Sequence, residues 1–185
     1  NGYKELHLSA RSQIILNPKG VKIDTVKTRD ALFEIKTKKI SELTEDDKNV
    51  VLRGTIVQLF DPRFYEICGI CGKRAAMENG NFKCVDHGVI DVSYAAVLNF
   101  FLDDSTENIR VVCFRKAAAD VLGINEGELN KLRENPSTFE NLRNTILGKQ
   151  LEISGKSSKN DMFNRLEFIG NRVEELRPEK LLEEN

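Results

Sequence analysis

Hydrophobic residues are concentrated in three runs in the middle of the chain, and each run is rich in Val, Ile, Leu and Phe. Runs of this composition that end at turn residues are typical of β-strands. They cover residues 49–60, 94–103 and 109–114. Gly54 lies inside the first run, where it predicts a bend or bulge of the kind found in strongly coiled barrel strands. We therefore predict three consecutive strands.

After the third run the spacing of apolar residues changes to a helical period. Residues 116–122 are rich in alanine and end at Gly123, and helical patterns continue over 126–133 and 137–147. Ser137 and Glu140 have the spacing of a capping box at the start of the last helix. Two further β-rich runs follow, at residues 150–155 and 165–169. Three strands, a helical connection and two more strands are the order of the five-stranded OB barrel.

Between the first two strands lie three of the four cysteines and one of the two histidines. Cys68 and Cys71 form one pair, Cys84 and His87 form another, and two residues separate the partners of each pair. This spacing predicts a zinc ribbon, because each tight turn points two side chains at one ion. Four protein ligands leave no open position for water, so we expect a structural Cys3His zinc site. Asn79-Gly80 between the pairs predicts the tip of a hairpin.

Other uses of these cysteines fit the pattern less well. A disulfide would leave one of the three clustered cysteines unpaired, and a thioredoxin-like pair needs a βαβ context that the sequence around Cys68 lacks. A zinc deaminase would need a His-x-Glu element and a Pro-Cys-x-x-Cys element, and neither is present. Cys113 lies in an apolar run and is expected to be a small buried side chain. A redox or metal-hydrolytic enzyme that uses Cys68 and Cys71 is kept as a third alternative, although we predict that the chain is not an enzyme.

Composition adds limits to this picture. The chain has 185 residues, with 28 basic and 29 acidic side chains and a net charge of −1, so any basic face must be local. No apolar run is long enough to predict a membrane span, and the few cysteines fit a reducing, intracellular compartment. The chain begins at Asn1 without a methionine, and we expect it to be a piece of a longer protein.

The resulting domain organisation has four parts. We predict the remnant of a preceding OB domain at 1–18, a linker at 19–40, the main domain at 41–170 and a helical tail at 171–185. The predicted fold class is a β-barrel: a five-stranded OB fold with a zinc ribbon (66–90) inserted between strands 1 and 2, helices between strands 3 and 4, and a C-terminal helix.

Residues 108–118, which include Arg110 and Phe114, resemble the DNA-binding OB domains of the large subunit of replication protein A (replication factor A). The inserted ribbon resembles, in particular, the zinc-bearing C-terminal OB domain of that subunit. Residues 60–64 and 164–168 are similar to the archaeal type. The resemblance covers residues 41–176. The Cys3His set departs from the four cysteines of eukaryotic members, and this difference bears on the affinity for zinc.

The resemblance implies sequence-independent binding of single-stranded DNA in replication, repair and recombination, in the cytoplasm or nucleoid of an archaeon. It implies stacking aromatics at Phe114 and Phe163. The alternation of side chains along a β-strand is consistent with this role for Phe114, since it places Arg110, Val112 and Phe114 on one face of the third strand. The other candidate contacts are one aromatic and a set of basic residues: Phe64, Arg53, Arg63, Lys73, Arg74, Arg115, Lys156, Lys159 and Arg165. We expect Phe60 to pack the ribbon onto the barrel, and leave Phe64 and Tyr65 open between packing and stacking.

The second hypothesis is that the domain is mainly a subunit-assembly module with auxiliary DNA binding. In the resembled family a helix after the barrel joins the other subunits into a heterotrimer. The tail has apolar residues at helical spacing that would serve as this hetero-oligomer interface: Val173, Leu176, Leu181 and Leu182.

Overall fold

The computed structural model describes residues 12–13, 15, 20 and 36–176. The chain divides into two units, Asn1–Phe33 and Glu34–Asn185, and the fold given below is that of residues 36–176 in the second unit. The predictions for residues 1–18, and for most of the linker at 19–40, lie outside the described residues. Among the described residues no helix is both long and apolar enough to cross a membrane.

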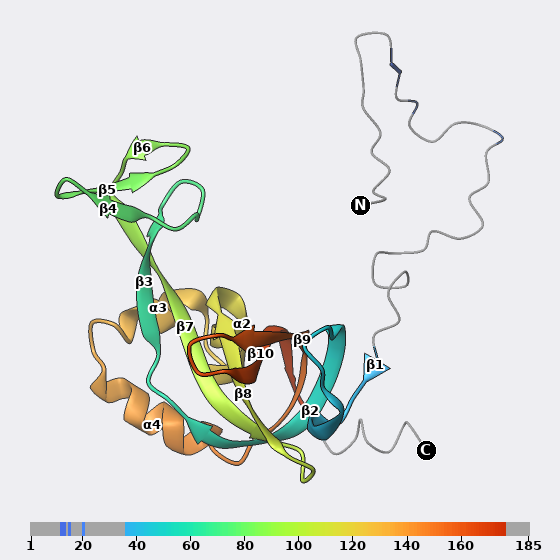
Figure 1. The fold of residues 1–185 in the computed structure, drawn as a ribbon. Helices are drawn as coiled ribbons and strands as arrows, with labels where there is room; N and C mark the ends of the chain where they lie inside the picture. Colours follow the sequence, from blue (N-terminus) through green and yellow to red (C-terminus); the bar gives the residue numbers. More distant parts are fainter. Residues whose placement is uncertain (1–11, 14, 16–19, 21–35, 177–185) are drawn as a thin grey trace. The chain divides into compact units, whose positions relative to one another are not determined.

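Five strands close into the barrel that the sequence predicted (Figure 1). They are β2 (Lys48–Leu59), β7 (Val92–Asp103), β8 (Asn108–Phe114), β9 (Gln150–Asn160) and β10 (Arg165–Glu175). Neighbours pair in the order β2-β9-β10-β8-β7, and β7 pairs again with β2 to close the ring. The β8–β10 pair is parallel, whereas the other four pairs of the ring are antiparallel. This is the OB fold.

Alternation along each strand builds the core. On β7 the side chains of Leu98, Phe100 and Leu102 point inward and are fully buried, whereas those between them point to the outer face. Inward residues of β2, β9 and β10 join them, including Leu52, Ile153 and Phe168. Gly155 lets β9 and β10 approach closely, because a Cβ placed there would lie 2.1 Å from the Ile169 carbonyl oxygen.

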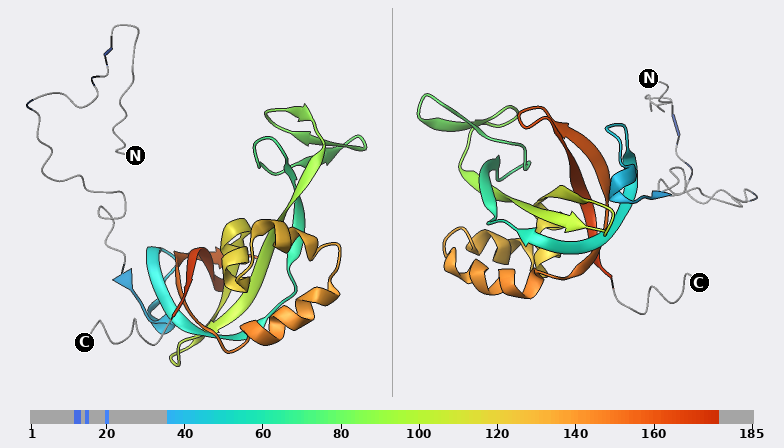
Figure 2. Two further views of the ribbon diagram at one scale, coloured as in Figure 1. Left: turned by 180° about the vertical axis from the view of Figure 1, so that it is seen from behind. Right: turned by 60° about the horizontal axis from the view of Figure 1, so that its bottom comes forward.

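Three helices connect β8 to β9 and lie together on one side of the barrel (Figure 2). They are α2 (Arg115–Leu122), α3 (Glu126–Lys131) and α4 (Ser137–Ile146). The alanines of α2 are buried, so this helix packs closely against β10 and β7. The helix then ends at Gly123, which adopts the left-handed conformation at φ 67°. The predicted capping box at Ser137 and Glu140 is wrong, since Pro136 holds the N-cap position without a side-chain cap.

The ribbon is the second sheet of this unit. After β2, strand β3 (Arg63–Cys68) pairs with the first half of β7, and Figure 1 shows this pair carrying the ribbon away from the barrel. Three short strands form the ribbon: β4 (Ala76–Glu78), β5 (Asn81–Cys84) and β6 (Gly88–Val89). Asn79 and Gly80 both have positive φ between β4 and β5, which confirms the predicted hairpin tip.

The ends of the unit differ from the predicted boundaries. Strand β1 (Lys36–Thr37) and the 3-10 helix η1 (Ile40–Glu42) precede β2, and Ile40 is buried in the barrel core. The barrel unit therefore begins inside the predicted linker. At the other end β10 continues to Glu175, so the helix predicted from Asn171 does not begin there. Residues 177–185 lie outside the described part of the chain.

Candidate metal centre and nucleic-acid interface

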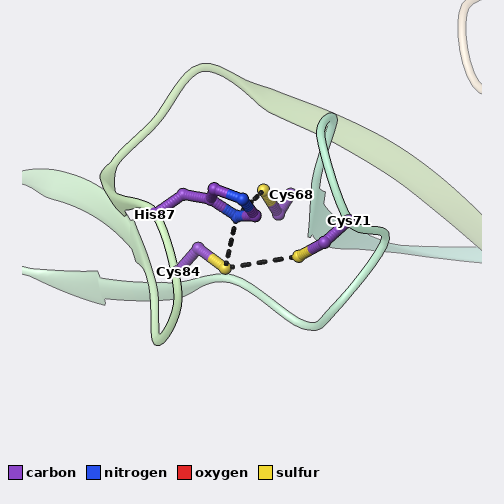
Figure 3. Close-up of side chains that lie close together, drawn as sticks. All are labelled: Cys68, Cys71, Cys84 and His87. Carbon is purple, nitrogen blue, oxygen red and sulfur yellow. Dashed lines mark hydrogen bonds between the residues drawn. The ribbon is translucent and has the colours of Figure 1, made fainter. Parts of the chain in front are cut away.

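Three thiols and one imidazole converge where the β3–β7 stem meets the ribbon (Figure 3). Cys68 ends β3 and Cys84 ends β5, and both are buried, while Cys71 and His87 lie in the two turns and are exposed. The four ligand atoms lie within 4.8 Å of one another. The site joins the stem, the first turn and the hairpin, so an ion there would cross-link all three.

The spacing of the ligand atoms suits a tetrahedral ion. Cys68 Sγ and Cys84 Sγ lie 3.5 and 3.6 Å from His87 Nδ1, and the Cys71 and Cys84 sulfurs are 3.5 Å apart. Three sulfurs at about 2.3 Å and one nitrogen at about 2.0–2.1 Å from one ion would give edges of about 3.5–3.8 Å. Cys68, Cys71, Cys84 and His87 could therefore bind a metal ion, through Nδ1 of the histidine.

Backbone amides prepare the cluster for a cation. The N–H groups of Cys71 and Ile70 donate to Cys68 and lower the pKa of its thiol, although burial opposes them. Those of Asp86 and His87 similarly lower the pKa of Cys84, assisted by the imidazole. The Lys73 N–H lowers the pKa of Cys71, but burial and the two neighbouring sulfurs raise it overall. Three sulfurs this close disfavour a third negative charge unless a cation balances them.

A second group of residues lies on the outer face of β7, β8 and β3. The outer residues of β8 are Arg110, Val112 and Phe114, as alternation predicted, and Cys113 points inward with its pKa raised by burial to about 12. Register places Phe101 opposite Arg110, Asn99 opposite Val112 and Val97 opposite Phe114. On β3, Arg63 lies opposite Val97 and is exposed. These residues form one surface, which we call the outer face.

Both predicted stacking aromatics are exposed. Phe114 is 42% exposed at the end of β8, and the edge of its ring meets Tyr65 of β3 at a centroid distance of 6.5 Å. Phe163 is 59% exposed in the β9–β10 turn, with the Arg165 guanidinium 4.9 Å from its ring centre. Phe64, by contrast, points inward and packs against the core, so the structure places Tyr65 rather than Phe64 on the outer face.

A further aromatic pair lies at the opposite end of the outer face. Phe60 and Phe101 have ring centres 6.0 Å apart, and the Arg110 guanidinium lies 6.0 Å from the centre of the Phe60 ring. Phe60 therefore does not pack the ribbon onto the barrel, which was the expectation for it. Sequence analysis missed Phe101, since its partner strands were unknown.

One buried carboxylate connects two of the arginines. Glu167 of β10 lies opposite Arg110 in the parallel β8–β10 register and is 7% exposed. Its Oε1 lies 3.5 Å from Arg110 Nη1 and accepts a 3.2 Å hydrogen bond from Arg165 Nε. Arg110 Nη2 also donates to Asn99 Oδ1 at 3.0 Å. Phe163, Arg165, Glu167, Arg110 and Phe60 thus form a continuous row of contacts.

The remaining basic candidates do not gather with this row. Three form ion pairs elsewhere: Arg53 with Glu152 across β2 and β9, Lys73 with Asp86 in the ribbon, and Lys159 with Glu45. Lys156 is exposed on β9, opposite Lys48.

Two basic candidates lie at or in the ribbon. Arg74 is exposed there, bridged to Ile67 of β3. Arg115 reaches from the start of α2 to the ribbon, where Nη2 donates to the Gly72 carbonyl oxygen.

The predicted subunit interface also changes. Val173 is 8% exposed in the barrel core, because β10 continues through it and pairs it with Ile153. It is therefore unsuited to a subunit contact. Leu176 is half-buried, and its N–H donates to the Gln150 carbonyl oxygen. Leu181 and Leu182 lie outside the described residues.

Comparison with solved structures finds the same fold. A replication protein A heterotrimer bound to single-stranded DNA matches with a TM-score of 0.64 and 20% identity, over 81% of this chain and 38% of that one. Yeast replication protein A bound to single-stranded DNA matches with a TM-score of 0.60 and 17% identity, over 82% of this chain and 97% of that one. The chain thus spans well under half of the first protein. No curated protein matches it.

A family comparison is more specific than the fold. Residues 50–180 match the model of the replication factor-A C-terminal domain, a span that includes all five barrel strands except the first residues of β2, together with the metal cluster. Domains of this family bind DNA and are not enzymes, which agrees with the prediction that this chain is not one. The chain belongs to the replication factor-A C-terminal domain family.

Proposed function

We propose that this domain binds single-stranded DNA without a strict sequence requirement, as part of a replication protein A complex that acts in replication, repair and recombination. The observation that carries the proposal is the outer face, where exposed aromatics alternate with arginines. Base stacking on an aromatic contributes about 1–3 kcal/mol per base and accepts any base, while arginines bind phosphates. The two replication protein A structures compared above, which share this fold, are bound to single-stranded DNA.

In this proposal Phe114 and Phe163 are the stacking platforms. Tyr65 supports Phe114 from the side, and Arg165 supports Phe163. Arg110 lies on β8 between Phe114 and the β9–β10 turn, and Arg63 of β3 lies across β7 from Phe114; both arginines would contact the DNA backbone. The arrangement resembles the basic groove and aromatic platforms of other OB folds that bind single strands.

The metal in this proposal is a structural zinc ion. Thiolate and imidazole ligands in tetrahedral geometry are typical of zinc, and Cys68, Cys71, Cys84 and His87 supply a closed set. Zinc would cross-link the ribbon, and it would have no part in chemistry because no coordination position is left for water. The ribbon in turn is continuous with β3, which carries Tyr65 and Arg63.

The test is fluorescence anisotropy of a labelled oligo-dT at two salt concentrations, with the Phe114→Ala/Phe163→Ala double variant beside the parent. Loss of two stacked bases should cost about 2–6 kcal/mol of binding free energy. Leu147→Ala, which removes a side chain of similar exposure at the end of α4, should bind like the parent. Absence of binding by the parent at low salt would refute the proposal for this domain alone.

Assembly with other subunits is the second candidate function, and a heterotrimer among the solved relatives favours it. We propose that the segment after β10, with Leu176, Leu181 and Leu182, makes this contact in an intracellular complex of archaeal type. Replacing Leu181 and Leu182 by Glu should release the domain from co-purified subunits, as measured by size-exclusion chromatography with light scattering. An intact complex would contradict the assignment, and Val173 should not be used because it lies in the core.

A further inference from the structure

The outer face contains a hollow that sequence analysis did not anticipate. It has a volume of roughly 450 Å³ and is lined by Phe60, Asp61, Arg63, Asn99 and Arg110. This volume falls within the range of small-ligand pockets, so a single nucleobase fits. What the hollow selects depends on the groups that line it.

Phe60 gives the hollow an aromatic wall. Phe60 is 37% exposed, and Phe101 supports its ring at a centroid distance of 6.0 Å. A planar base can therefore stack on the Phe60 ring, and stacking alone would accept every base.

Arginine donors surround the same space. Arg110 uses Nη2 on Asn99 and Nη1 on Glu167, but its Nε is buried and makes no hydrogen bond to the described residues. Arg63 is exposed at the rim. The Arg110 guanidinium nevertheless lines the hollow, and each of its terminal nitrogens carries a second N–H, so an acceptor on the edge of a ligand would be favoured beside it.

Asp61 is the acceptor in the lining. Arg143 of α4 donates to Asp61 Oδ1, and this contact holds the carboxylate at the rim. A carboxylate has about four lone-pair sites, so it can still accept hydrogen bonds from a ligand. The hollow thus presents an aromatic wall, arginine donors and a fixed carboxylate.

We infer that this hollow is a guanine-preferring base subsite within the single-stranded DNA interface. Guanine presents the acceptors O6 and N7, which arginine recognises, and the donors N1–H and N2–H₂, which a carboxylate recognises. Adenine lacks the O6 acceptor and the N1–H donor. Thymine has no second donor for the carboxylate, and cytosine offers it the exocyclic N4–H₂ but no ring N–H beside it. The inference rests on the proposed function and adds a preference at one position to binding that is otherwise tolerant of sequence.

The experiment measures binding of the full 185-residue chain to labelled oligo-dT strands that carry one central dG, deoxyinosine or dA. Deoxyinosine keeps O6, N7 and N1–H but lacks the 2-amino group, so it isolates the contact of that amino group with Asp61. We expect the dG strand to bind about tenfold more tightly than oligo-dT, with deoxyinosine between them and dA close to oligo-dT.

Two variants assign the preference to the hollow. Asp61→Asn should reduce the ratio of dG to deoxyinosine affinity to about one, and Asp61 is exposed enough for the variant to fold. The matched control Glu126→Gln, which also neutralises one carboxylate but on α3, should keep the parent's ratio. Equal affinities of the parent for the dG, deoxyinosine and dA strands would overturn the guanine subsite, since the hollow would then take any base or a phosphate. The proposed function would stay intact in that case if oligo-dT still binds. Absence of binding to every strand would instead reject both.

Discussion

Replacement of Glu167 by Gln should change the stability and the DNA affinity of this domain in opposite directions. The carboxylate is nearly buried on β10, between Arg110 at 3.5 Å and Arg165 at 3.2 Å. In the free protein it neutralises part of the charge of both guanidiniums. When DNA binds, a phosphate competes for the same guanidiniums and is repelled by the carboxylate beneath them. Gln is nearly the same size and still accepts a hydrogen bond, so the variant removes mainly the charge.

The two effects can be estimated separately. A phosphate on the outer side of either guanidinium would lie about 7 Å from Glu167, and the repulsion between two unit charges at this distance is about 0.6 kcal/mol in water and about 2.4 kcal/mol at an effective dielectric constant of 20. The Arg165 side chain is 41% exposed, which favours the lower part of this range. We therefore expect Glu167→Gln to bind oligo-dT about three- to tenfold more tightly at low salt. The loss of charge-assisted hydrogen bonds should lower the free energy of unfolding by about 1–2 kcal/mol.

Urea unfolding and fluorescence anisotropy measure the two quantities on the same preparations. Glu152→Gln is the matched control, because Glu152 pairs with Arg53 at 2.7 Å across β9 and β2, outside the row of contacts on the outer face. It should be destabilised to a similar or smaller extent with unchanged DNA affinity. If Glu167→Gln instead lost both stability and affinity, Glu167 would be positioning Arg110 and Arg165 rather than competing with phosphate, and the electrostatic reasoning would be refuted.

Two further predictions concern the ribbon. Removal of the metal with a chelator, or Cys71→Ser, should expose the amides of β4–β6 to rapid hydrogen exchange while β8–β10 stay protected. The reason is that Ala75 is the only buried apolar residue between Cys68 and Cys84, so the cluster must supply most of the stability there. Equal protection with and without metal would contradict this prediction. Arg115 has a positive φ of 49° and donates to Gly72 of the ribbon. Both Arg115→Gly and Arg115→Ala lose this contact but only Gly relieves the backbone strain, so the Gly variant should melt at a higher temperature than the Ala variant, by the equivalent of about 1 kcal/mol. Identical melting temperatures would show that the backbone there is not strained.

The sequence was most informative where local chemistry alone dictates structure. Two ligand pairs can converge on one ion only if each pair forms a tight turn, so Cys68, Cys71, Cys84 and His87 determine the ribbon independently of the barrel. Buried strands such as β7 and β8 were also predictable, because their inward residues are large and apolar. Asn79-Gly80 gave the hairpin tip, since few other pairs accept positive φ at both positions.

Predictions failed where tertiary contacts decide between two local patterns. Val173 and Leu176 are spaced as on a helix, but β10 continues because Val173 pairs with Ile153 and fills the barrel core. The capping box occurs one helix earlier, where Asn125 Oδ1 accepts from Glu128 N–H at 2.9 Å and Glu128 Oε2 accepts from Asn125 N–H at 3.0 Å. Ser137 had the same spacing with Glu140, but its hydroxyl donates to Asn135 Oδ1 instead.

The outer face was predictable only in part, because which residues share it depends on register between strands far apart in sequence. Alternation within β8 was enough to place Arg110 with Phe114. Placing Phe101 beside Arg110 requires knowledge of the β7–β8 register, and placing Glu167 beside Arg110 requires knowledge of the parallel β8–β10 pairing. Arg53 follows the same alternation on β2, but it pairs with Glu152 of β9 rather than with a residue of β7 or β8.

The composition of the outer face indicates which interaction should provide most of the affinity. The row and the hollow contain three arginines, at 63, 110 and 165, but also the carboxylates of Asp61 and Glu167, which leaves about one net positive charge. A surface with so little net charge releases few counterions when it binds a single strand, so its salt dependence should be shallow. The exposed rings of Phe60, Phe114 and Phe163 are not limited in this way, because an uncharged ring can stack on a base without neutralising a phosphate or releasing a counterion. An almost neutral chain can therefore bind a polyanion, provided that its aromatic side chains rather than its charges supply the larger share of the binding free energy.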